Sequence, residues 1–201
     1  MGVLLENGGE QMRLFTFMPL QAYKDTLKKA GRYVCDYSKT GNDEGDIEDV
    51  FAPAYAWLVE KMSERIGPAP DGVEFPVWAW YRNDCYSGDL YRTWGKTGSR
   101  YVKIELEIAE DRLVFTDFEE WHCVLNDCPC VADHENFDSE WDRIYAAGEE
   151  AIRASWDLIF TKDAPYVQVT FWELRTADIV SVTEFVSEHS EYDLEEDEES
   201  A

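Results

Sequence analysis

The clearest alternation of apolar and polar residues lies in the stretch YVKIELEI, residues 101–108. Its apolar positions are Val102, Ile104, Leu106 and Ile108, and its charged positions are Lys103, Glu105 and Glu107. A period of two predicts a strand with one buried face and places the three charged side chains in solvent. Shorter apolar runs predict further strands at 14–17, 32–37, 75–81, 112–115, 166–174 and 179–186.

Apolar residues at helical spacing predict helices between these strands. One covers residues 20–30 and ends at Gly31, which suits a C-terminal cap. A second, stopped by Gly67-Pro68, has an apolar face that consists of Phe51, Tyr55, Leu58, Met62 and Ile66.

Two further helices follow, each with its own start signal. Thr116 and Glu119 match a capping box for a helix that turns Trp121 and Leu125 inward. Asp138 or Ser139 caps a longer helix with an apolar stripe, which consists of Trp141, Ile144, Tyr145, Ile152, Trp156 and Ile159.

Two polar stretches predict surface segments. Residues 38–50 form a loop, and residues 82–100, with three Gly, form a long exposed connection of the kind that often carries function. Regular strand–helix alternation is too scarce for a doubly wound sheet. The sequence therefore predicts a single α+β domain over residues 12–186, with a mixed or antiparallel sheet and flanking helices.

Composition agrees with a packed domain. An apolar content of 45% in 201 residues is ample for a core. No apolar run reaches the ~18 residues that a membrane span needs, and the start, MGVLLENGGEQMRLF, lacks the features of a secretion signal. These features predict a soluble, cytoplasmic protein without a membrane partner.

The net charge of −25 disfavours electrostatic binding to a phosphate backbone. Residues 187–201 hold many of the acids and are predicted to form a disordered tail. Two interpretations of the acidity stay open. One is a general bias that keeps proteins soluble. The other is an acidic interaction protein, such as an inhibitor that mimics nucleic acid and occupies a protein partner.

A group of Cys and His residues raises the question of a metal. The stretch WHCVLNDCPCVADH contains His122, Cys123, Cys128, Cys130 and His134. One residue between Cys128 and Cys130 is awkward spacing for two ligands of one zinc ion, so zinc is disfavoured and no metal site is predicted. The five Cys of the chain are expected to be free thiols.

The strand VWAWYR, residues 77–82, offers a second candidate site. Trp78 and Trp80 share one face, opposite Val77, Ala79 and Tyr81. Such aromatic residues usually form core, although they also stack on nucleobases. Tyr81 and Arg82 are the residues expected to reach a pocket at the strand end, where Arg82 could meet a phosphate. The chain has no nucleophile elbow G-x-S-x-G and no phosphate-binding loop G-x-x-x-x-G-K.

Four stretches together resemble an uncharacterised bacterial family that is known only as a domain of unknown function. They are LFTFMPLQAYKDTLKKAGRYVCD, AYAWLVEKMSERIGPAPDGVEFPVWAWY, LVFTDFEEWHCVLND and VQVTFWELRTADIVSVTEF. The resemblance covers nearly the whole chain up to residue 186 and implies no mechanism.

Both ends of the domain are also similar, more distantly, to ADP-ribosyltransferase-like domains. The matching features are Thr16 before the first helix, Gly31-Arg32-Tyr33 after it, and Gln168 before Ile179 and Val182. This resemblance implies NAD or a related nucleotide as the ligand.

The same resemblance assigns roles to residues. It places Thr16, Arg32 and Tyr81 near the nicotinamide and Gln168 where the family carries a catalytic glutamate. Glutamine cannot act as a base or stabilise a cation as a carboxylate does. Glu173 is the nearest acid, on the opposite strand face. The resemblance thus implies an active transferase or a catalytically degenerate, binding-only form.

Overall fold

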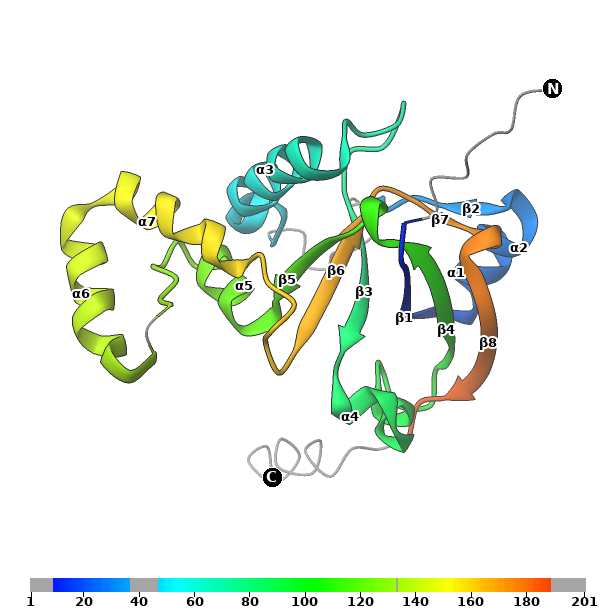
Figure 1. Ribbon diagram of the computed structural model, residues 1–201. Helices are drawn as coiled ribbons and strands as arrows, with labels where there is room; N and C mark the ends of the chain where they lie inside the picture. The colour runs from blue at the N-terminus through cyan, green and yellow to red at the C-terminus, as the bar shows by residue number, and fades with distance from the viewer. Residues whose placement is uncertain (1–8, 37–46, 133, 189–201) are drawn as a thin grey trace.

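Six strands form one antiparallel sheet in the computed structural model, which describes residues 9–36, 47–132 and 134–188 (Figure 1). The strand order is β5-β6-β3-β1-β4-β8. The strands are β1 (Gln11–Pro19), β3 (Val77–Arg82), β4 (Arg100–Ala109), β5 (Val114–Asp117), β6 (Val167–Phe171) and β8 (Ile179–Val186). The predicted α+β class with an antiparallel sheet is confirmed.

Helices lie on both sides of this sheet. On one side, α1 (Leu20–Asp25) and α2 (Leu27–Ala30) lie beside a two-stranded sheet, which consists of β2 (Arg32–Tyr33) and β7 (Leu174–Arg175) (Figure 1). On the other side lie α3 (Ile47–Ile66) and α5 (Phe118–Leu125), and α6 (Phe137–Ala147) and α7 (Glu149–Ser155) extend beyond α5, past the β5 edge of the sheet. No described helix is long and apolar enough to cross a membrane.

Strand alternation divides the core into layers. Val102, Ile104, Leu106 and Ile108 are buried on the face that α1 and α2 cover, as predicted. The other face carries two aromatic clusters. One surrounds Trp121 and Trp156 beneath α3 and α5, and the other surrounds Phe17, Trp80, Tyr101 and Phe185. The predicted separation of Trp78 and Trp80 from Val77, Ala79 and Tyr81 is confirmed.

The sheet is weakly joined at its centre, between β1 and β3. Strands β1 and β4 pair along their length, from Gln11 with Ala109 to Pro19 with Tyr101. Between β1 and β3, by contrast, the register holds one pair, Phe15 with Trp80. The ladder is interrupted beyond this pair, and the end of β1 and the start of β3 border the cavity described below.

Several predicted boundaries are confirmed. Gly31 caps α2 in the left-handed conformation, with φ 77°, and α3 ends at Ile66 before Gly67, with φ 84°. The last strand lies where the sequence predicts it, at Ile179–Val186, whereas the strand predicted over 166–174 is divided into β6 and β7, which belong to different sheets. Glu173, expected on the opposite strand face from Gln168, lies between these two strands. Hydrogen bonds continue two residues past residue 186, because Ser187 N donates to Ser99 O and Glu188 N donates to Arg92 O. The rest of the predicted acidic tail, residues 189–201, lies outside the described residues.

The prediction that Lys103 points into solvent is wrong. Lys103 is only 8% exposed, its Nζ donates to Tyr86 O at 2.9 Å, and it lies 4.7 Å from the ring centroids of both Phe15 and Tyr91. Burial lowers the pKa of its ammonium group. The cause is the segment 83–99, which folds over this face of the sheet.

Most residues of this segment are exposed, as predicted for the connection 82–100, but the segment also has regular structure and packs its aromatic side chains on the sheet. It contains α4 (Asp84–Ser87) and the short 3-10 helix η2 (Asp89–Thr93). Tyr86, Tyr91 and Trp94 are partly buried against the aromatic cluster around Phe17, with Trp94 stacked on Phe17 at 5.1 Å.

Four helix predictions need correction. The helix predicted over 20–30 is split at Thr26 into α1 and α2, and α3 begins at Ile47, inside the predicted loop 38–50. Residues 37–46 lie outside the described part. The cap of α5 is Asp117, whose Oδ1 accepts from Glu119 N at 2.9 Å, rather than Thr116.

The last predicted helix differs at its start and in its middle. It begins at Phe137 with Asn136 at the capping position, so neither Asp138 nor Ser139 caps it. Gly148, with φ 92°, separates α6 from α7, and the 3-10 helix η5 (Trp156–Ile159) continues the chain. Tyr145, expected on the buried stripe, is 57% exposed.

Candidate functional site

A cavity of about 1070 Å³ lies where β1 and β3 part. Pro19 ends β1 and Pro76 precedes β3, and both line the cavity. Proline has no N–H to give to a strand ladder, so two prolines at this point favour separation of the strands. Thr16 Oγ1 donates to Trp78 O at 2.9 Å. This carbonyl therefore accepts a hydrogen bond from a side chain, whereas in a continuous sheet it would accept one from a backbone N–H.

The walls of the cavity are largely aromatic. Phe17, Trp78, Trp80 and Trp94 line it from the sheet and from segment 83–99. Trp94 is held against Phe17 at 5.1 Å and against Tyr101 at 5.0 Å, the latter edge to face. Flat aromatic faces beside a few polar groups are typical of sites for ring-containing ligands.

The polar groups enter from β6, α1 and β2. Gln168 pairs in register with Trp80 and lines the cavity, and within the described residues its side-chain amide has no hydrogen-bond partner. Asp25 and Thr26 line it from α1 and the α1–α2 junction. An amide can both donate to and accept from a ligand hydroxyl.

Beside β2 the cavity wall carries a tyrosine and a cysteine, Tyr33 and Cys35, whose side chains stay protonated at neutral pH. Burial, with the nearby Cys35 and Asp36, raises the pKa of Tyr33 to about 12. Burial and the charge of Asp36 likewise raise the pKa of Cys35. The phenol and the thiol are therefore neutral hydrogen-bonding groups, and Arg32 is the cation among the described lining residues.

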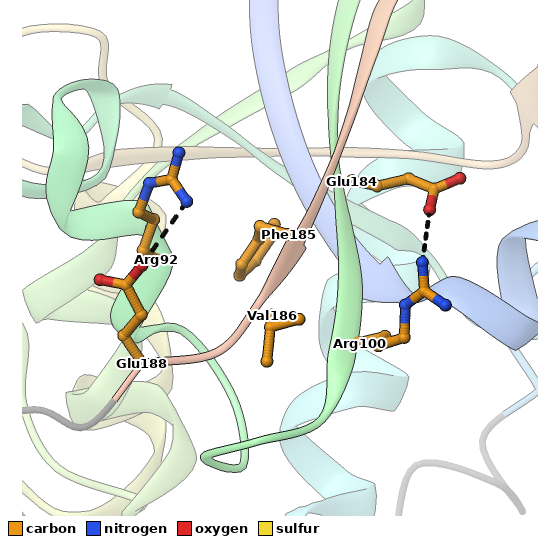
Figure 2. A pocket seen from close by; sticks show the side chains of 6 residues that line it. All are labelled: Arg92, Arg100, Glu184, Phe185, Val186 and Glu188. Atoms are coloured by element: carbon orange, nitrogen blue, oxygen red, sulfur yellow. Dashed lines mark hydrogen bonds and ion pairs between the residues drawn. The ribbon is translucent and has the colours of Figure 1, made fainter.

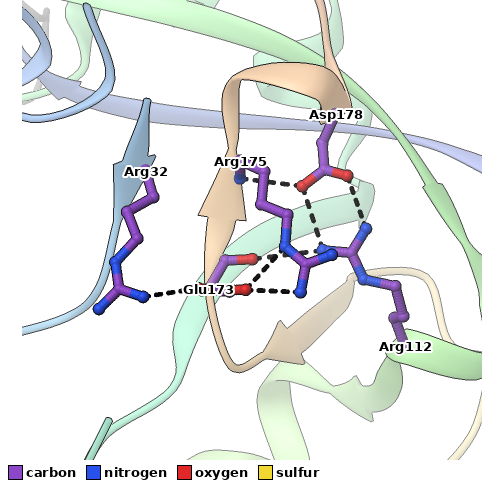
Figure 3. A network of polar contacts seen from close by, with 5 residues as sticks. All are labelled: Arg32, Arg112, Glu173, Arg175 and Asp178. Carbon is purple, nitrogen blue, oxygen red and sulfur yellow. Dashed lines mark hydrogen bonds and ion pairs between the residues drawn. The ribbon is translucent and has the colours of Figure 1, made fainter. Parts of the chain in front are cut away.

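Arg32 belongs to a polar network at the edge of the cavity (Figure 3). Its Nη1 lies 3.5 Å from Glu173 Oε2, and Arg175 approaches Glu173 Oε1 at 2.5 Å through Nη2. Arg112 forms two bonds to Asp178, at 2.6 and 3.1 Å. The carboxylate of Glu173 is thus bound by two guanidinium groups.

The structure brings three of the six predicted site residues together. Thr16, Arg32 and Gln168 line the same cavity. Tyr81 instead packs edge to face on Phe115 at 5.1 Å, and Arg82 Nη1 donates to Ala164 O at 2.8 Å. These two residues lie on the far side of the Phe15–Trp80 pair, away from the opening.

The sixth predicted residue, Glu173, is 11% exposed at its side chain and lies in the arginine network rather than among the residues that line the cavity. Sequence reasoning missed Trp94, Phe17 and Arg175. The two prolines were the available signal for the opening, but they mark its place only once β1 and β3 are known to be neighbours.

A second, smaller cavity of about 340 Å³ lies beside the end of β8 (Figure 2). Its charged residues are already paired, Arg100 with Glu184 at 3.1 Å and Arg92 with Glu188 at 3.5 Å. The aromatic residue among those that line it, Phe185, already packs edge to face on Tyr91 at 5.1 Å.

The thiols of the Cys and His stretch are hydrogen-bonded within the protein. Cys130 is fully buried and donates to Glu120 O at 3.7 Å, and Cys128 donates to Asn126 O at 3.4 Å. A hydrogen bond between the Cys123 and Cys130 thiols lowers the pKa of Cys123 and, with burial, raises that of Cys130. The described residues contain no group of three or more His, Cys, Asp or Glu that could hold a metal ion, and the side chain of His134 lies outside the described part.

The fold and site define a class of protein: an α+β domain with an aromatic-walled cavity that opens through its central sheet. The chain belongs to the family described as Domain of unknown function (DUF3841), whose model matches residues 13–180. The predicted membership in a domain-of-unknown-function family is confirmed. No curated protein and no solved structure matches the chain.

Proposed function

We propose that the chain binds NAD or a related nucleotide in the cavity between β1 and β3, as a catalytically degenerate ADP-ribosyltransferase-like domain. The observation that carries the proposal is the convergence of Thr16, Arg32 and Gln168 on one aromatic-walled cavity. Its volume, about 1070 Å³, is large enough for a dinucleotide-sized ligand.

The chemistry of the lining groups supports binding rather than catalysis. Aromatic faces stack on a nicotinamide or a purine, and the amide of Gln168 can hydrogen-bond a ribose hydroxyl. Glu173, the nearest acid in sequence, is held between Arg32 and Arg175. No carboxylate replaces Gln168 at the position that the resemblance gives to the catalytic acid.

Thermal unfolding with and without millimolar NAD tests the proposal. A ligand at 100 times its Kd stabilises the folded state by about 2.7 kcal/mol, which raises the melting temperature of a domain of this size by roughly 2–4 °C for each kcal/mol. We expect a rise with NAD, ADP-ribose or another nucleotide, and no release of nicotinamide from NAD.

Two arginine variants show whether the rise comes from the cavity. Arg32→Ala removes a lining cation and should reduce the rise. Arg143→Ala is the matched control, because Arg143 is an exposed arginine on α6 whose recorded partner is Glu140, one turn away. It should leave the rise unchanged.

Three results would count against the proposal. If the protein releases nicotinamide, the degenerate form is wrong. If Arg32→Ala and Arg143→Ala behave alike, the ligand binds elsewhere. If NAD, ADP-ribose and nucleotides produce no rise, nucleotide binding fails, and the acidic interaction protein becomes the better interpretation of a chain with net charge −25.

A further inference from the structure

Strands β2 and β7 place two arginines directly opposite each other, Arg32 and Arg175. Like charges on opposite residues of an antiparallel pair destabilise the pair. Both side chains are 53% exposed, so neither is held back from solvent. The fold therefore keeps an unfavourable pair of cations accessible beside the cavity that Arg32 lines.

Glu173 holds the two guanidinium groups in place without using all their donors. Arg175 gives Nε and Nη2 to Glu173 Oε1, at 2.7 and 2.5 Å, and Arg32 approaches Oε2 through Nη1 at 3.5 Å. A guanidinium has five N–H donors, so both groups keep donors for a further acceptor. Figure 3 shows the two side chains reaching Glu173 from neighbouring strands.

Arg112, the third arginine of the network, has a different role. It binds Asp178 through two bonds, and Asp178, which is 6% exposed, also accepts from Arg175 N at 2.9 Å. This pair joins the β7–β8 turn to the 3-10 helix η3 (Glu110–Arg112). Asp178 compensates the charge of Arg112, whereas Arg32 and Arg175 share the single charge of Glu173.

The surrounding surface adds positive charge. Lys28 and Lys29 are exposed on α2, which leads through Gly31 into β2. Thr176 N and Oγ1 both bond Gly31 O, at 2.9 and 2.8 Å, so the end of β7 is attached to the end of α2. Asp25 and Asp36 also line the cavity, so its lining as a whole is not cationic. The cations gather at the edge that β2 and β7 form, and in a chain of net charge −25 this local gathering indicates an anionic ligand group.

We propose that Arg32 and Arg175 form a clamp for the phosphate groups of the ligand, so that the ligand class is a nucleoside carrying a diphosphate. The inference rests on the proposed function, since it takes the base and ribose to lie in the aromatic cavity. Guanidinium groups bind phosphate oxygens in pairs of charge-assisted hydrogen bonds, and two groups oriented by one carboxylate present such pairs side by side.

Binding of adenosine, AMP and ADP, a series with none, one and two phosphate groups, tests the clamp in the full chain. Apparent Kd values come from thermal shift at increasing concentration of each compound. For the wild type we expect affinity to rise at least tenfold from adenosine to ADP, and the rise to shrink as NaCl is added. Arg175→Ala should remove about tenfold of ADP affinity and leave adenosine affinity unchanged, because Arg175 does not line the cavity.

Two further variants keep the test decisive. Arg143→Ala should leave the affinity for each compound of the series unchanged. Arg175→Lys keeps the charge without the paired donors and should recover only part of the ADP affinity. If Arg175→Ala does not fold, as judged by circular dichroism, Arg175→Lys alone tests the clamp against the wild type.

The failures are distinguishable. If Arg175→Ala and Arg175→Lys show the same rise in affinity from adenosine to ADP as the wild type, the clamp is overturned while nucleotide binding stands. Equal affinity of the wild type for adenosine and ADP also overturns the clamp alone. Absence of binding by adenosine, AMP, ADP and NAD alike overturns the proposed function together with the clamp.

Discussion

Tyr33 connects the stability of the protein to the wall of the cavity. Its phenol is partly buried beside Cys35 and Asp36, and burial, followed by these two neighbours, raises its pKa from 10.0 to about 12. The folded state therefore binds the phenolic proton more tightly than the unfolded state. The resulting stabilisation is fully present below pH 10 and is lost as the pH rises toward 12.

We expect Tyr33→Phe to lose stability less steeply between pH 10 and 12 than the wild type. Urea unfolding across this range measures the difference. The ultraviolet absorbance of tyrosinate provides an independent reading, because the variant should lack one late-titrating phenol. Parallel stability curves for the two proteins would contradict the assignment. Tyr81→Phe is the control, since Tyr81 packs on Phe115 outside the cavity.

For single residues, the resemblance to ADP-ribosyltransferase-like domains grouped Thr16, Arg32 and Gln168, which line one cavity, but it did not give the rest of the site. Tyr81 was expected there because it ends an aromatic strand. The opening instead begins at the other end of that strand, near Pro76 and Trp78. The end of β3 that separates from β1 is set by the pairing register of the two strands. A local sequence pattern cannot predict the register between segments about 60 residues apart.

Among the elements, segment 83–99 forms a wall whose geometry depends on one glycine. Gly95 has φ 82°, and a Cβ there would lie 2.5 Å from Tyr101 Cζ. Lys96 N donates to Tyr101 Oη at 2.9 Å, so the ring is fixed close to the backbone. Trp94, next to this glycine, is the aromatic residue that the segment contributes to the cavity.

Gly95→Ala should destabilise the protein more than Gly98→Ala. Gly98 also has positive φ, 77°, but a Cβ there meets nothing within 4 Å. The backbone strain of about 1–2 kcal/mol is common to both variants. The clash with Tyr101 adds about 1–3 kcal/mol in Gly95→Ala alone. Urea unfolding measures this difference. Equal losses of unfolding free energy in the two variants would show that segment 83–99 can move away from Tyr101 without destabilising the protein.

Elements with strong periodicity were predictable, and their interruptions were not. The stripe of α3 and the alternation of β4 gave correct elements because each is repeated over several turns or residue pairs. The break at Gly148 lies inside an apolar stripe that continues on both sides, so spacing alone does not reveal it. Lys103 shows the same limit, since its burial comes from Phe15, Tyr86 and Tyr91 rather than from its own strand.

For the whole molecule, the main feature is a strongly acidic chain with a local concentration of cations. The net charge of −25 produces self-repulsion that opposes the folded state. The cations around Arg32 and Arg175 act in the opposite sense, because they attract an anionic ligand to one place on the surface. Salt screens both effects, with a Debye length of about 10 Å at 0.1 M.

The two effects predict opposite responses to NaCl in one experiment. The melting temperature of the protein alone should rise with NaCl, because screening weakens the repulsion among its acids. The additional rise caused by ADP should shrink over the same range, because screening also weakens the attraction between phosphate and arginine. Choline chloride is the control for specific sodium binding and should act like NaCl. A melting temperature that falls with both salts would show that attractive ion pairs, such as Arg112 with Asp178, outweigh the repulsion of the net charge.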